Sequence, residues 1–186
     1  MKKTTFGMTG LIAVILGIFL VVEISHYLNK YSNSGSAADI EREIERRSGM
    51  EIEIRDLMVT DDKLHFVFTA GQMVGSGEFE RGWNRKFKFE SFGHGTNGMR
   101  QRIVETDKGQ YLMLAGRNDE HIGRIRAFVD DEAYDVDIPD APYYLVMTPV
   151  QGTDRKFATG MLVYDREGTE LARISVPAGA SSPPVR

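Results

Sequence analysis

The stretch Glu51-Ile-Glu-Ile-Arg-Asp-Leu-Met-Val-Thr-Asp-Asp-Lys-Leu-His-Phe-Val-Phe68 decides the fold class of this chain. Apolar residues occupy alternate positions on both sides of the Asp61-Asp62 pair, with one slip near Asp56. A period of two is typical of half-buried β-strands, and a short acidic pair between two such runs suits a tight turn. The sequence therefore predicts a hairpin. The inner face of its second strand carries Leu64, Phe66 and Phe68, and His65 lies on the opposite, solvated face.

The same pattern continues along the chain. Residues 87–89 and 134–138 alternate apolar with charged side chains, and the continuous apolar runs 143–147 and 161–164 are typical of central strands. No helical pattern separates these segments, so a parallel sheet is not expected. The sequence predicts about eight or nine strands that form one antiparallel β-sandwich over residues 50–177.

Turn signals between the strands agree with this prediction. Asp107-Lys-Gly109 and Asp165-Arg-Glu-Gly168 both end in glycine, which takes the positive-φ position of a bulged hairpin without strain. The C-terminal residues 178–186 are small and rich in proline. We expect this tail to be disordered.

The N-terminal stretch Phe6–Val22 carries no charge and follows Lys2 and Lys3 directly. Apolar residues just beyond Glu23 extend it to the ~20 residues that a hydrocarbon core of ~30 Å requires. Basic residues stay on the cytoplasmic side of a membrane, so the N-terminus is expected inside. Residues 1–28 are therefore predicted to be a cytoplasmic tip and a single-pass transmembrane anchor at the cell membrane, with the C-terminal domain extracytoplasmic.

A cleaved signal peptide is the alternative interpretation of the same stretch. Cleavage requires small residues a few positions after the apolar core. The window Glu23-Ile-Ser-His-Tyr27 is a poor site, and the small residues Ser34-Gly-Ser-Ala-Ala38 lie too far downstream. We therefore favour an uncleaved anchor.

Residues 29–49 are predicted to form a linker and a short helix. Ile40 and Ile44 are spaced i, i+4 among alternating Glu and Arg residues, and Gly49 suits a helix end. The many charges favour a mostly solvated stalk.

The composition limits the class of protein. The chain has 186 residues, 41% of them hydrophobic, which is enough for one domain beyond the anchor. The absence of cysteine excludes disulfides, thiol nucleophiles and Cys-based metal sites. The net charge of −4 makes nucleic acid an improbable partner. An exported domain without cysteine fits a bacterial cell envelope.

The segment from Ile122 to Leu171 carries a resemblance. It contains Ile122-Gly-Arg-Ile125, Tyr134-Asp-Val-Asp-Ile138, Tyr143-Tyr-Leu145 and Val163-Tyr-Asp-Arg-Glu-Gly-Thr-Glu-Leu171. This pattern resembles single-pass, membrane-anchored, extracytoplasmic Ig-like β-sandwich proteins of Gram-positive bacteria that lack an assigned activity. The resemblance implies an Ig-like fold and an envelope location, and it carries over no catalytic residue.

One stretch mixes cations with aromatic residues as ligand-binding surfaces do. The candidate ligand-binding residues are Trp83, Arg85, Lys88, Phe92 and His94. Trp83 and Phe92 are the ones to test for exposure, whereas His94 falls in a Gly-rich loop, residues 93–98. The competing interpretation is a plain strand and a plain connection.

No catalytic residue, metal site or cofactor is predicted. Ser76 and Ser91 lie in no nucleophile motif, and the acidic residues from 130 to 140 lack the spacing of a calcium loop. The hypothesis is a non-catalytic envelope protein whose β-sandwich binds or scaffolds a protein partner outside the membrane. The alternative is a glycan or cell-wall binding module, and a hydrolase is a third, less favoured class.

Overall fold

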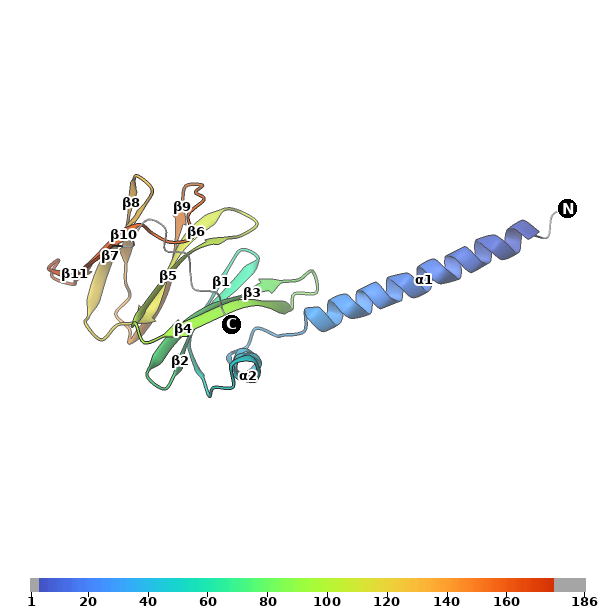
Figure 1. Cartoon of the computed structure of the whole chain (residues 1–186), viewed down its shortest axis with the longest axis horizontal. Helices are drawn as coiled ribbons and strands as arrows, with labels where there is room; N and C mark the ends of the chain where they lie inside the picture. The colour runs from blue at the N-terminus through green and yellow to red at the C-terminus, as the bar shows by residue number, and fades with distance from the viewer. Residues whose placement is uncertain (1–3, 176–186) are drawn as a thin grey trace.

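The computed structural model describes residues 4–175, with side chains described from Gly10 onward. A long N-terminal helix extends away from a β domain, and a second, short helix lies against that domain (Figure 1). The chain is mainly β. The elements are α1 (Thr4–Lys30), α2 (Ala37–Ser48), β1 (Glu53–Thr60), β2 (Lys63–Ala70), β3 (Met73–Arg81), β4 (Phe87–Gly95), β5 (Met99–Glu105), β6 (Gln110–Arg117), β7 (Ile122–Val129), β8 (Glu132–Asp137), β9 (Tyr143–Val150), β10 (Gly160–Asp165) and β11 (Glu170–Ser175).

The strands form three antiparallel sheets, which we call sheet A (β1-β2-β3-β4), sheet B (β5-β6-β9) and sheet C (β11-β10-β7-β8). The predicted antiparallel β architecture is confirmed, but eight or nine strands were too few. The sequence pattern missed the Gly-rich β3 and the fully buried centre of β6, because neither alternates apolar with polar residues. The run 161–164 lies on an interior strand as predicted, whereas the run 143–147 lies on an edge strand of sheet B.

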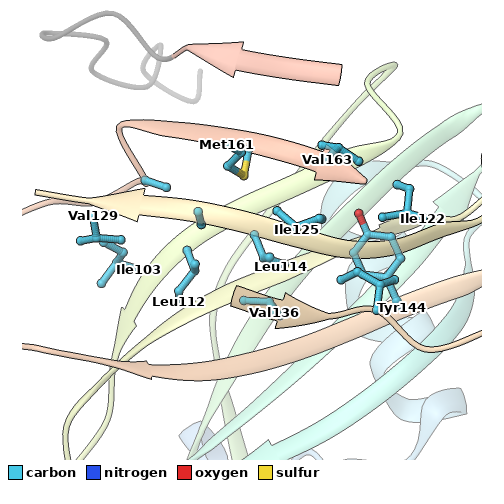
Figure 2. Close-up of a cluster of buried hydrophobic side chains, with 13 residues drawn as sticks. Ile103, Leu112, Leu114, Ile122, Ile125, Val129, Val136, Tyr144, Met161 and Val163 are labelled. Atoms are coloured by element: carbon cyan, nitrogen blue, oxygen red, sulfur yellow. The ribbon is translucent and has the colours of Figure 1, made fainter. Parts of the chain in front are cut away.

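Sheet B lies between the other two sheets. Leu112 and Leu114 of β6 belong to a cluster that also holds core residues of sheet C (Figure 2). The alternate residues Met113 and Ala115 belong to a second cluster, which they share with Val67 of sheet A. Since successive side chains of a strand point to opposite faces, β6 is covered on both sides. A sandwich has two packed sheets, so the prediction did not include the third sheet.

The β1–β2 hairpin confirms the prediction from its sequence in most respects. Asp61 has a φ of 56° in the two-residue turn, and the pairing register shifts between Ile54 and Asp56. The prediction that one face of β2 is exposed to solvent was wrong, because His65 and Val67 on that face are both 0% exposed. Sheet B covers the face of β2 that was expected to meet water.

Helix α2 is part of the domain. The Ser36 hydroxyl caps its N-terminus by accepting a hydrogen bond from the Asp39 amide, and Gly49 ends it with a φ of 70°. The predicted helix and its stop are confirmed. Most of the helix is accessible to solvent, but Ile40 and Ile44 are 0% exposed and belong to the core cluster of sheet A, so the helix packs on the domain.

Helix α1 carries the apolar N-terminal run. Its residues Gly10–Lys30 form a 21-residue segment that is long and apolar enough to cross a membrane or to be a signal sequence. The side chains from Leu11 to Val22 are exposed, so the domain does not cover them. The tip before Thr4 and the tail predicted for residues 178–186 lie outside the described residues.

Candidate functional site

The predicted ligand-binding residues fall into two groups at opposite ends of β4. Trp83 and Arg85 lie in the turn between β3 and β4, whereas Phe92 and His94 lie near the other end of the strand. A strand rises about 3.3 Å per residue, so several residues of β4 separate the groups by more than 15 Å. One ligand of ordinary size would not contact all five residues.

The second group is built into the strand. The predicted loop 93–98 was placed too early, because β4 continues through Gly95. His94 stacks on Phe92 with ring centroids 6.2 Å apart, and Phe92 is half-buried against Phe68 and Phe89. Phe92 therefore belongs mainly to the core of sheet A.

The first group meets the end of helix α1. Trp83 is 70% exposed, yet its ring stacks on that of Tyr27 at 5.1 Å. The backbone N–H of Trp83 donates to the Tyr27 hydroxyl at 2.7 Å, and Tyr27 stacks on Tyr31 at 4.4 Å. Tyr27 and Tyr31 share one helix face because they are four residues apart. Three aromatic rings thus connect the helix to the β3–β4 turn.

Polar contacts fix the same junction. The Tyr31 hydroxyl donates to Glu80 Oε1 at 2.6 Å, and the Asn84 side-chain amide donates to the backbone oxygen of Tyr31 at 2.9 Å. Lys88 Nζ lies 2.9 Å from Glu80 Oε2 and also contacts Glu90. We call Tyr27, Tyr31, Glu80, Trp83, Asn84 and Lys88 the anchor junction.

The charges of the junction stabilise one another. The hydrogen bond from Tyr31 and the contacts with Lys88 together lower the pKa of Glu80 to about 2, although burial acts in the opposite direction. Burial opposes the charge of Lys88, but its contacts with Glu90 and Glu80 raise the pKa of this ammonium group above its usual value. The ion pair is therefore charged throughout the physiological pH range.

The linker between the helices is attached to the domain. Asn33 and Phe87 exchange two backbone hydrogen bonds, of 3.2 and 2.9 Å. The Phe87 ring lies against Gly35, whose φ of 80° suits glycine and where a Cβ atom would collide with that ring. A Cβ atom on Gly82 would collide with both tyrosines of the junction. The chain therefore passes from α1 to α2 along a defined path.

A cleft of about 560 Å³ opens between the linker, α2 and β4. Its apolar surface comes from phenylalanines of sheet A, and its polar surface carries five basic and two acidic side chains. The charged residues that line it are Lys30, Asp39, Arg42, Glu43, Arg46, Arg47 and Lys88. We call this cavity the basic cleft.

Two contacts organise the basic cleft. The Arg47 guanidinium lies 4.0 Å from the centroid of the Phe89 ring, a cation–π distance. Glu43 accepts from both Arg46 and Arg47, at 2.8 and 2.6 Å, and these arginines lower the pKa of Glu43 although its burial acts in the opposite direction. The positive charge that remains in excess can attract an acidic group.

A partly buried polar cluster lies between sheets A and B. Arg102 donates to the Ser91 hydroxyl and to Glu78 Oε1, both at 2.8 Å, and Ser91 itself donates to Glu78 at 3.2 Å. His65 Nδ1 is 4.0 Å from Glu78 Oε2, and neither ring nitrogen has a hydrogen-bond partner within the described part of the chain. Burial lowers the pKa of His65 to about 4. The hydroxyl of Ser91 is engaged with a carboxylate and not with a histidine base.

Two carboxylates of the acidic stretch near residue 130 form ion pairs with arginines. Asp130 pairs with Arg155 at 3.0 Å, and Asp135 pairs with Arg126 at 2.7 Å. Ser76, the other serine considered as a nucleophile, lies half-buried within β3.

The sequence interpretation named Trp83 and Arg85 as candidates, but it did not include Tyr27, which contacts Trp83, or the basic cleft. The i, i+4 spacing of Tyr27 and Tyr31 was a usable signal for an aromatic helix face. Comparison of the chain with family models, with curated proteins and with solved structures found no match.

Proposed function

We propose that this chain is a single-pass membrane protein whose extracytoplasmic β domain binds or scaffolds a protein partner close to the membrane, without catalysis. In this proposal α1 spans the membrane with its N-terminus inside. The Ig-like relationship and the Gram-positive envelope location suggested by the resemblance belong to the same proposal. The support comes from α1, from the anchor junction and from the basic cleft.

The observation that carries the proposal is the fixed attachment of α1 to the domain. Stacked rings and hydrogen bonds join Tyr27 and Tyr31 to the β3–β4 hairpin. A flexible linker would let the domain sample many heights and orientations above a membrane. A fixed junction instead presents the same face to a neighbour, which is what a scaffold in an assembly needs.

The basic cleft is the surface that fits a protein partner. It lies beside Lys30, the last residue of the apolar segment, and so opens near the membrane. The phenylalanines that line the cleft can contact an apolar side chain of the partner, while Arg42 and Arg46 attract carboxylates. The proposed occupant is an acidic segment of a membrane-associated protein.

The test is crosslinking capture from membranes that contain the full-length protein. The variant Arg42→Gln/Arg46→Gln removes two exposed arginines that line the cleft, each of which has one carboxylate partner on α2. The matched control Arg126→Gln/Arg173→Gln removes two exposed arginines of sheet C, each with one carboxylate partner. We expect a crosslinked partner that the control retains and the cleft variant loses. Equal capture by both variants would contradict the cleft as the binding surface.

Glycan or cell-wall binding is the second candidate. The observation in its favour is the 70% exposure of Trp83, since sugar rings stack on open aromatic faces. Trp83 is the single tryptophan of the chain, so its fluorescence reports directly on this position. A saturable emission change on addition of cell-wall glycan fragments would favour this function, and an unchanged spectrum would exclude Trp83 as a sugar platform.

A further inference from the structure

We infer that the tip of the β3–β4 hairpin, residues 82–86, is a second membrane contact that binds the anionic headgroup layer beside α1. The inference rests on the proposed membrane-spanning role of α1 and adds a lipid-binding surface to it. The hairpin tip reaches toward α1 on the side of the domain from which that helix leaves (Figure 1). No part of this surface is needed for partner binding in the basic cleft.

The depth of Trp83 follows from its contacts with α1. Tyr27 lies three residues before Lys30, the end of the apolar segment, which is about 4.5 Å along a helix axis. Trp83 is held at the level of Tyr27 by a backbone hydrogen bond of 2.7 Å and by ring stacking. The headgroup layer on each side of a bilayer is roughly 5–8 Å thick. If α1 spans the membrane, Trp83 therefore lies within the interface.

The chemistry of the tip suits that layer. Tryptophan and tyrosine concentrate at membrane interfaces, where an apolar ring and a polar N–H or O–H are both accommodated. Trp83 is 70% exposed although it is one of the largest apolar side chains in the domain. An exposed indole next to a membrane-spanning helix is explained when lipid covers it.

The tip carries positive charge, although the chain as a whole has a net charge of −4. Arg81, Arg85 and Lys86 are exposed and close to Trp83 in the chain, and within residues 10–175 none of their side chains forms an ion pair. Nearby Lys88, by contrast, is paired with Glu80 and Glu90. Unpaired basic side chains beside an apolar segment attract anionic lipid headgroups. Two turn hydrogen bonds, from Gly82 to Lys86 at 2.7 Å and from Arg85 to Gly82 at 3.0 Å, hold the tip in shape.

The fluorescence of Trp83 tests the inference in the full-length protein. The protein is reconstituted into phosphatidylcholine vesicles with or without phosphatidylglycerol, and flotation first establishes that it is anchored. Lipids brominated near the headgroup then quench a tryptophan in the interface, whereas aqueous iodide quenches one in water. The reference is Trp83→Tyr/Leu171→Trp, which moves the indole to an exposed position on β11.

We expect brominated lipid to quench Trp83 and iodide to quench it at least about twofold less than the reference tryptophan, as interfacial burial predicts. The variant Arg85→Gln/Lys86→Gln should weaken lipid quenching in vesicles with phosphatidylglycerol. The double variant Arg155→Gln/Lys156→Gln is the control, because it removes two positive charges from neighbouring positions between β9 and β10. It should leave lipid quenching of Trp83 unchanged.

The outcomes separate the two proposals. Failure to float with vesicles would contradict the anchor itself. Flotation with Trp83 as accessible to iodide as the reference, and not quenched by brominated lipid, would overturn the hairpin contact alone. Lipid quenching that is equal for both charge variants would overturn the role of anionic headgroups.

Discussion

The anchor junction and sheet C use the same kinds of polar side chains for different purposes. At the junction, the Tyr31–Glu80 and Asn84–Tyr31 hydrogen bonds join residues about fifty positions apart in the chain, and Lys88 is only 17% exposed. In sheet C, the Arg126–Asp135 pair bridges adjacent strands at the surface, with side chains 40% and 47% exposed. Partly buried contacts between distant segments fix geometry, whereas exposed pairs contribute little.

The comparison extends to the helices. α2 and the junction lie at the end of the domain next to α1, where a covered face of sheet A meets two helical segments. Sheet C lies at the other end of the stack (Figure 1). Its Arg126–Asp135 and Arg173–Glu170 pairs are exposed to solvent. The largest energetic effects in the first region should therefore come from packing, and the smallest effects in the molecule from the surface pairs of sheet C.

The largest predicted effect comes from the contact between α2 and sheet A. Ile44→Ala removes a side chain that is 0% exposed beneath the helix, and we expect it to lower the free energy of unfolding by about 2–5 kcal/mol. Urea denaturation of the full-length protein in detergent, followed by circular dichroism, measures the change. The control Arg46→Ala lies on the exposed side of the same helix and should leave the midpoint nearly unchanged. An equally small effect of Ile44→Ala would mean that α2 is a detached stalk.

The second-largest predicted effect is a decrease in stability at low pH, which arises from His65 in sheet A. Burial lowers the pKa of His65 from 6.5 to about 4, so His65 is neutral in the folded protein at pH values where it is protonated in the unfolded chain. Above pH 6.5 the ring is neutral in both the folded and the unfolded chain, so it adds no pH dependence there. As the pH falls from 6.5 to 4 the unfolded chain gains the proton first, and stability decreases by about 3 kcal/mol in total.

The variant His65→Leu isolates this contribution. Glu78, Arg102, Lys63 and Asp62 are the charged groups that act on the ring, and they remain in the variant. We expect the variant to lose less stability than the natural protein between pH 7 and pH 4, as measured by urea midpoints. The exposed His94 is the control, because His94→Gln should keep the full pH dependence. Parallel pH curves for His65→Leu and the natural protein would show that His65 does not titrate as its burial implies.

The β1–β2 hairpin shows how much of the fold the sequence could predict. Alternation and turn chemistry are local, and they correctly predicted the strands, the turn at Asp61 and the irregularity near Asp56. The burial of His65 depends on sheet B, which comes from residues far along the chain. Local period therefore predicts a strand but not how many layers cover it.

The candidate site shows the same limit. Trp83 and Arg85 were predicted together because they are neighbours in sequence, and they remain together in the turn. Phe92 and His94 were grouped with them on composition alone, and the length of β4 separates the two ends. The partner of Trp83 is Tyr27, 56 residues earlier, and only the tertiary structure brings them into contact.

A third, smaller effect compares two tyrosine hydroxyls. Tyr31→Phe removes the hydrogen bond to Glu80 while keeping the stacked ring, and we expect a loss of about 1–2 kcal/mol, as for a hydrogen bond to a charged group. Tyr134→Phe removes the hydroxyl that donates to Glu132 at the edge of sheet C, in an exposed setting, and should have a much smaller effect. Urea midpoints of both variants measure the difference. Equal losses would remove the distinction between junction and surface.

The smallest predicted effect concerns salt. Lys88→Gln removes a partly buried ammonium group that bridges Glu80 and Glu90, and its loss of stability should persist at high ionic strength. Arg126→Gln removes an exposed partner of Asp135, and any loss should disappear at 1 M NaCl, where the screening length falls to about 3 Å. Thermal midpoints at low and high salt check both variants. If the Lys88 effect also vanished in salt, the junction would be held by its aromatic rings and neutral hydrogen bonds, because stacking does not depend on ionic screening.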